Sequence, residues 1–204
     1  MPTTFPSPFP AHQGLVYPLM RRWPDSYDVI ALSVGAAMPD FVDITFGLLL
    51  NGYFRHWFAH GLIFIPVNVL GGLLLTWVIR ALLSKLFRRE TPVDQNNMSG
   101  RISRLKVWIF SATVGVLSHL GFDLFSHDTN LLLYPWYEDI RWFPQWWYTP
   151  WYVIQPPLSM GPAYSVGIHT LIWLILSMIG TFLFYQFVFQ KIKSINRDTI
   201  FPRV

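Results

Sequence analysis

Four long apolar stretches constrain the fold of this 204-residue chain more than any other feature. They cover about residues 27–50, 60–83, 105–125 and 166–190, and each can cross about 30 Å of hydrocarbon as a helix. Water is absent there, so a spanning segment satisfies its backbone only as a helix or in a closed barrel. With 52% hydrophobic and 13% charged residues, the sequence predicts an all-α, polytopic membrane helix bundle.

The segments between these stretches complete a single predicted membrane domain, residues 1–204. Residues 1–26 form an N-terminal segment with a short helix, and 27–127 hold the first three spans. An aromatic outer loop follows at 128–164, then the fourth span at 165–190 and a basic tail at 191–204. Residues 88–104 are polar and rich in turn formers, which predicts a loop.

The positive charges predict how the helices cross the membrane. Lys and Arg concentrate between the second and third spans and again after the fourth. The positive-inside rule places both regions, and therefore both termini, in the cytoplasm. No basic stripe is interleaved with aromatic residues, so nucleic acid is not an expected partner. Membrane lipid is expected, and the sequence does not indicate an oligomeric state.

Polar ligand-type residues interrupt the third span at regular intervals. His119, Asp123 and His127 are four residues apart, a step that drifts only about 40° around a helix, so they share one face. Two imidazoles and a carboxylate are suitable ligands for a divalent ion such as zinc. Because ionisable groups are expensive in lipid, this face indicates a functional site. A structural polar network is the alternative.

Other histidines and acids fall in the same outer layer of this topology. His56 and His60 have the same four-residue spacing, and His169 begins the fourth span. The chain has no cysteine, so His, Asp and Glu are its only strong metal ligands. Solvated interfacial histidines and a hydrogen-bonded core histidine remain alternatives for these three positions.

Asp40 and Asp43 in the first span are the candidate catalytic residues. Each could act as the general base or could orient a ligand imidazole. A helix cap is the alternative for Asp40, because it follows Pro39, and simple solvation is the alternative for Asp43. His12 lies on the cytoplasmic side of this topology. It joins the site only if the N-terminal segment re-enters the membrane.

Residues 134–152 contain Trp, Tyr and Phe at high density, broken by three prolines. Amphipathic rings favour the headgroup layer, and prolines disfavour a long helix. The segment is therefore expected to be either a membrane anchor on the outer face or a lid that admits a lipid.

Several short motifs together resemble a known family. They are Ala11-His-Gln13, residues 35–41 (GAAMPDF), 55–60 (RHWFAH), 117–128 (LSHLGFDLFSHD) and Gly167-Ile-His169. The pattern is similar to small bacterial and archaeal inner-membrane proteins of a domain-of-unknown-function type, described as membrane-bound metal-dependent hydrolases. The resemblance implies metal-dependent hydrolysis and also nominates His12 as a ligand. The Trp-rich segment is not part of the family pattern.

The leading hypothesis is a membrane-embedded, metal-dependent hydrolase. His119, Asp123 and His127, with one or both of His56 and His60, would hold one or two divalent ions, most plausibly zinc. The expected substrate is a phosphoester or a lipid headgroup at the outer leaflet. Two alternatives stay open: a transport or ion-handling protein, and a non-catalytic membrane scaffold with a structural metal.

Overall fold

The computed structural model describes residues 10–49, 58–87, 98–126, 132–134, 136–137, 142–154 and 164–200. Short helices come first: α1 (Ala11–Leu15), α2 (Tyr17–Arg22), α3 (Val29–Gly35) and α4 (Met38–Leu49). The turns η1 (Phe58–His60) and η2 (Leu62–Phe64) lead into α5 (Ile65–Phe87), which α6 (Met98–Ser126) follows. The chain ends with α7 (Gln145–Tyr148), β1 (Tyr152–Ile154), β2 (Tyr164–Val166) and α8 (Ile168–Ile200).

Among the residues that the structure describes, three helices are long and apolar enough to cross a membrane: Leu62–Lys85, Ser103–Ser126 and Ile168–Gln190. A fourth crossing is formed if the bent pair Val29–Gly35 and Met38–Phe46 counts as one span. The prediction of an all-α membrane helix bundle is confirmed, and these helices indicate an integral membrane protein. The side of the membrane that each terminus occupies stays a prediction.

The prediction that residues 27–50 form one continuous helix was wrong. The chain bends by 49° between α3 and α4. Pro39 explains the break, because it has no N–H to continue the hydrogen-bond ladder and is tolerated only in the first turn of a helix. Upstream, the side chain of Asp28 caps α3 by accepting a hydrogen bond from the Ala31 N–H at 2.9 Å.

Two other boundaries differ from the sequence prediction. α6 begins at Met98, so residues 98–104 are helical rather than part of a loop. Once a helix is formed, each added residue gains a hydrogen bond, so it continues beyond its apolar portion. The aromatic segment also contains strand β1, which pairs antiparallel with β2 and joins Tyr152 to Val166. Apolar periodicity does not reveal strands this short.

Glycines allow two pairs of helices to pack at backbone contact. A Cβ atom on Gly115 of α6 would lie 2.4 Å from the Leu32 carbonyl oxygen of α3. A Cβ atom on Gly14 of α1 would lie 1.6 Å from the Gly180 carbonyl oxygen of α8. Small residues at helix contacts are typical of membrane proteins, where burial from water does not drive association. These contacts fix α3 on α6 and α1 on α8.

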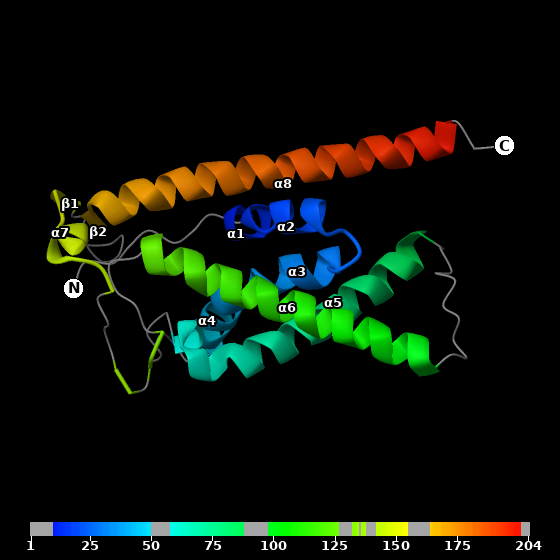
Figure 1. Cartoon of the computed structure of the whole chain (residues 1–204), viewed down its shortest axis with the longest axis horizontal. Helices are drawn as coiled ribbons and strands as arrows, with labels where there is room; N and C mark the ends of the chain where they lie inside the picture. Colours follow the sequence, from blue (N-terminus) through cyan, green and yellow to red (C-terminus); the bar gives the residue numbers. More distant parts are fainter. Residues whose placement is uncertain are drawn as a thin grey trace.

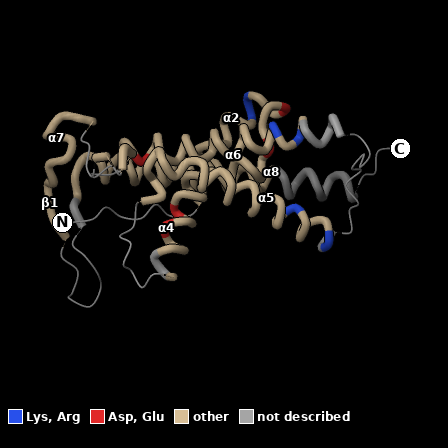
Figure 2. Tube along the Cα trace, turned by 90° about the horizontal axis from the view of Figure 1, so that it is seen from below, with Lys and Arg blue, Asp and Glu red and all other residues tan. Residues whose placement is uncertain are grey.

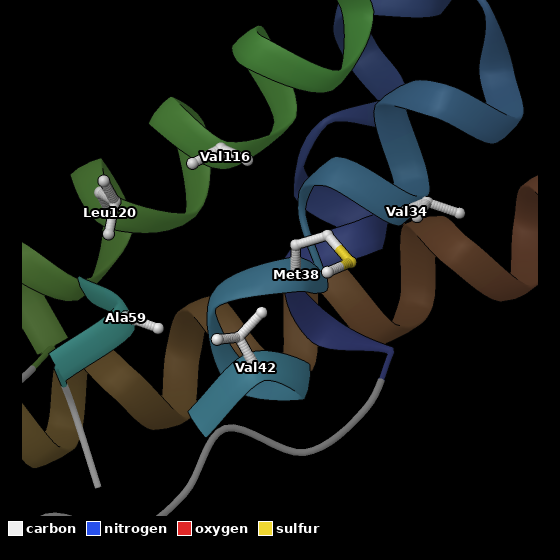
Figure 3. Packing of buried hydrophobic residues seen from close by; sticks show 6 residues of the cluster. All are labelled: Val34, Met38, Val42, Ala59, Val116 and Leu120. Atoms are coloured by element: carbon white, nitrogen blue, oxygen red, sulfur yellow. The ribbon is translucent and has the colours of Figure 1, made fainter. Parts of the chain in front are cut away.

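The helices are arranged in layers. α1 and α2 lie between α8 and the group formed by α3, α5 and α6 (Figure 1). A hydrophobic core fills the space between α3, α4, η1 and α6 (Figure 3). Its buried members are Val34, Met38, Val42, Ala59, Val116 and Leu120. This core supports the helix faces from which the polar side chains of the next section project.

Candidate metal centre

Four side chains from three elements converge beside this core. His60 ends η1, His119 and Asp123 lie one turn apart on α6, and Asp40 lies in the first turn of α4. The two Nε2 atoms are 3.1 Å apart, and each lies 3.1 Å from Asp123 Oδ2. Asp40 Oδ1 is 3.6 Å from the Nε2 atom of His60 and 3.7 Å from that of His119. These five distances join four ligand-type atoms around one point.

The Nδ1 atoms determine what the two Nε2 atoms can do. His119 Nδ1 lies 2.8 Å from the Ala36 carbonyl oxygen, which only accepts hydrogen bonds. His60 Nδ1 lies 2.9 Å from Asp43 Oδ2, which also accepts when ionised. Both Nδ1 atoms therefore donate, and in a neutral ring each Nε2 presents a lone pair. Two nitrogen lone pairs and a carboxylate oxygen face one another at about hydrogen-bond distance.

Such a convergence of lone pairs favours positive charge at its centre, either protons on the imidazoles or a metal cation. One shared proton satisfies a single pair of atoms, whereas a divalent cation is attracted by all of them at once. A tetrahedral ion with bonds of about 2.0–2.2 Å has ligand atoms about 3.3–3.6 Å apart. The observed separations of 3.1–3.7 Å bracket that range. The residues therefore fit a zinc-type ion.

Asp43 stands behind His60 and does not share the ligand point. Its Oδ2 atom accepts from the imidazole, and its Oδ1 atom accepts from the Ala59 N–H at 2.9 Å. Asn68 of α5 donates to the Ala59 carbonyl oxygen at 2.7 Å, which also fixes η1. A carboxylate behind a ligand histidine sets its tautomer and orientation. Of the two roles considered for Asp43, the geometry matches the orienting one.

His12 lies close to the cluster, and the expectation that the topology would separate it was wrong. Its Nε2 atom is 3.5 Å from Asp123 Oδ1, and its ring centroid is 4.0 Å from that of His119. α1 packs on α8 within the bundle, so the N-terminal segment enters the layer of the site. His12, His119 and Asp123 form a second possible ligand group, with ligand atoms within 4.8 Å of one another.

The remaining nominated histidines have different outcomes. His169 is fully buried at the start of α8 and belongs to neither possible ligand group among the described residues. Its ring instead lies against the backbone of Gly167. His56 and His127 lie outside the described residues, so their nomination as ligands stays a prediction.

Sequence reasoning missed two contributors to the site, the Ala36 carbonyl oxygen and Asn68. The carbonyl contributes because the chain breaks at Pro39, which was a visible signal for a helix end. Asn68 has 0% exposure near the start of the apolar α5 span. A buried amide in such a segment is a polar exception that could have been singled out.

The described part of the site has acids and imidazoles but no neighbouring cation from the chain. Figure 2 shows Lys and Arg gathered toward one end of the molecule, around α2 and the far end of α5, away from the acidic segment of α4. Asp40, Asp43 and Asp123 are all carboxylates, and Asp43 and Asp123 are buried. A cation from solution would neutralise this charge.

Comparison with known proteins identifies the family. The model of Domain of unknown function (DUF4184) matches residues 1–197, and the chain belongs to this family. No curated protein and no solved structure matches the chain.

Proposed function

We propose that this DUF4184 protein is a membrane-embedded, metal-dependent hydrolase. The supporting observation is the convergence of His60 Nε2, His119 Nε2 and Asp123 Oδ2 at mutual distances of 3.1 Å. These three residues would hold a divalent ion, and the mixture of imidazole and carboxylate favours zinc. Three protein ligands with a further position available are typical of catalytic rather than structural zinc.

Asp40 has the exposure that a reacting group needs. Its side chain is 42% exposed, whereas those of His60, His119 and Asp123 are at most 8% exposed. A substrate can therefore reach the cluster on the Asp40 side. At that position the carboxylate can complete the ligand set or accept a proton from an attacking water.

A phosphoester is the substrate class that we propose. A divalent ion supplies Lewis acidity, which makes water a usable nucleophile near neutral pH. Asp40 accepts a proton from water as the water oxygen bonds to phosphorus. The bond between phosphorus and the leaving oxygen breaks, and Asp40 returns the proton to that oxygen, so an alcohol and a phosphate product are released.

Metal analysis of the purified protein tests the proposal directly. Wild-type protein should contain zinc or another divalent ion and should release product from a phosphoester. His119→Asn should lose both properties. His169→Asn is the matched control, because His169 is an equally buried histidine outside the ligand groups, and it should retain both. The site would be refuted if wild-type protein contained no metal and the His119→Asn variant had the same properties as wild type.

Two experiments separate this proposal from its alternatives. If the ion only joins helices, a chelator should lower the melting temperature and no catalytic turnover will be found with any phosphoester. If the protein handles ions, flux into proteoliposomes should occur without hydrolysis. The helix-joining alternative has one observation in its favour, because the ligands come from α4, η1 and α6.

A further inference from the structure

Six exposed aromatic rings gather in one part of the structure, which we call the aromatic cap (residues 136–137, 142–154 and 164–166). They are 51–68% exposed and comprise Trp136, Tyr137, Trp142, Trp146, Trp151 and Tyr152. The described cap residues include no Lys, Arg, Asp or Glu. Exposed rings with polar N–H or O–H groups suit a layer that is partly apolar and partly wet.

The cap backbone is held in a defined conformation. Trp151 N–H donates to the Val166 carbonyl oxygen at 2.8 Å, which extends the β1–β2 pairing by one bond. Phe143 N–H donates to the hydroxyl of Tyr148, which is 9% exposed. The Phe143 ring stacks on Trp147, with 4.6 Å between ring centroids. These contacts fix the cap internally and leave its remaining rings outward.

The cap also lies at the level where the spans end. The α6 span ends at Ser126, the α8 span begins at Ile168, and the cap occupies the chain between them. Figure 1 shows α7, β1 and β2 at the α8 N-terminus, the end of the molecule toward which α6 also runs. Phe143 contacts Phe125 of α6, with 5.3 Å between ring centroids. Lys and Arg gather at the opposite end (Figure 2).

The metal centre lies near the same end of the membrane spans as the cap. Asp123 is three residues before the end of the α6 span, a rise of about 4.5 Å, and His119 is about 10 Å before it. His60 is two residues before the start of the α5 span at the same end. A bilayer has about 5–8 Å of headgroup region outside each face of its hydrocarbon core. The site therefore lies just inside the edge of the hydrocarbon core, beneath the ester and phosphate groups of a lipid.

We propose that the aromatic cap docks in the headgroup layer of a phospholipid bilayer and holds the metal centre just beneath the lipid phosphates. This inference names a membrane phospholipid as the substrate and, in that part, rests on the proposed hydrolase function. The docking part is independent of any catalysis. A protein partner is disfavoured because lipid headgroups border a spanning bundle on every side at this level.

The absence of cysteine allows the docking to be measured at single positions. Trp146→Cys, Leu74→Cys and Asp25→Cys would each be spin-labelled in the full chain, in vesicles of phosphatidylethanolamine and phosphatidylglycerol. Leu74 is an exposed residue within the α5 span, and Asp25 is an exposed residue between α2 and α3. The ratio of accessibilities to oxygen and to a water-soluble nickel chelate gives the depth of each label.

The label at position 146 should lie between the two controls in depth. A label as accessible to nickel as the one at position 25 would overturn the docking. So would a label as deep as the one at position 74. Protection from both oxygen and nickel would indicate a protein partner and would also overturn it.

Hydrolysis then tests the substrate. The variant Trp136→Ala/Trp146→Ala/Trp151→Ala should hydrolyse phosphatidylglycerol vesicles about tenfold more slowly, a loss of about 1.4 kcal/mol. It should hydrolyse the soluble diester bis-para-nitrophenyl phosphate at the wild-type rate. The matched control replaces Leu70, Leu74 and Trp77, exposed residues of the α5 span, with alanine and should change neither rate.

The outcomes distinguish the two proposals. Equal losses on both substrates, or an unaffected lipid rate, contradict the role of the cap in lipid hydrolysis while the hydrolase proposal stands. If wild-type protein hydrolyses neither substrate, the hydrolase proposal fails and the lipid-substrate part fails with it. The depth measurement still decides the docking in that case.

Discussion

Two polar clusters lie within the apolar helices, and they balance charge in opposite ways. In the first, Arg80 of α5 pairs with Asp28, which also caps α3, and the Arg80 guanidinium lies 5.1 Å from the Trp108 ring centre. Ser111 of α6 accepts a hydrogen bond from the Asp28 N–H at 2.8 Å. The chain thus supplies both signs of charge in this cluster.

The second cluster, at the metal centre, combines three carboxylates with imidazoles whose Nδ1 atoms are already donating. Its described residues include no Lys or Arg. The first cluster is a polar contact that is complete within the chain and joins helices. The second could hold a metal ion. The following predictions test this distinction, from the largest expected effect to the smallest.

Removal of one ligand should have the largest effect. In Asp123→Ala the shared oxygen that lies 3.1 Å from both Nε2 atoms is lost, and we expect the bound ion to be lost with it. Elemental analysis of purified protein measures this. Arg80→Met should keep its ion, since Arg80 belongs to the other cluster. Equal metal content in Asp123→Ala and wild type would show that the two clusters do not differ in this way.

Added metal should stabilise the folded protein only through the second cluster, at the metal centre. Binding to the folded state at one hundred times the dissociation constant contributes about 2.7 kcal/mol. Zinc should therefore raise the melting temperature of metal-stripped wild-type protein, and a chelator should reverse the shift. His119→Asn should show no shift. Because protons compete with metal for imidazole, the zinc-induced shift should shrink as the pH falls. A shift that grows toward low pH would contradict binding through these histidines.

Asp43→Asn should weaken metal binding without abolishing it. The amide has one acceptor oxygen for two donors, His60 Nδ1 and the Ala59 N–H, and it lacks the negative charge behind the ring. Substitutions of this kind lower metal affinity about 10–100-fold, which corresponds to about 1.4–2.7 kcal/mol. Competition against a fluorescent zinc chelator measures the affinity. Unchanged affinity would show that Asp43 only fixes the loop through Ala59.

The smallest effect is expected at the first cluster, in which Arg80 neutralises Asp28. Arg80→Met should lower stability by about 1–2 kcal/mol, between the values for exposed and buried ion pairs, since the Arg80 side chain is 36% exposed. The double variant Arg80→Met/Asp28→Asn should recover part of the loss, because no unpaired charge remains. Thermal melting in detergent compares the three proteins. A larger loss of stability in the double variant than in Arg80→Met would contradict the interpretation that Arg80 stabilises the protein by pairing with Asp28.

Local sequence patterns predicted much of the fold. They also predicted the relative placement of two of the four converging side chains, His119 and Asp123. Apolar length predicted the spans, and four-residue spacing predicted that His119 and Asp123 share a helix face. Other positions did not follow from spacing. His60 was nominated together with His56, His169 was nominated but lies apart from the ligand groups, and His12 was expected on the wrong side. These differences arise from contacts between segments far apart in the chain, which helical periodicity does not contain.

By itself the sequence determined that this chain forms apolar helices with His and Asp on an interior face, because hydrocarbon permits few backbone conformations and makes unmatched polar groups costly. The tertiary structure decided which of those groups meet. Glycine contacts bring α3 against α6 and α1 against α8, and the break at Pro39 presents the Ala36 carbonyl oxygen to His119. Convergence within about 3 Å depends on how whole helices pack, and that is a property of the assembled bundle.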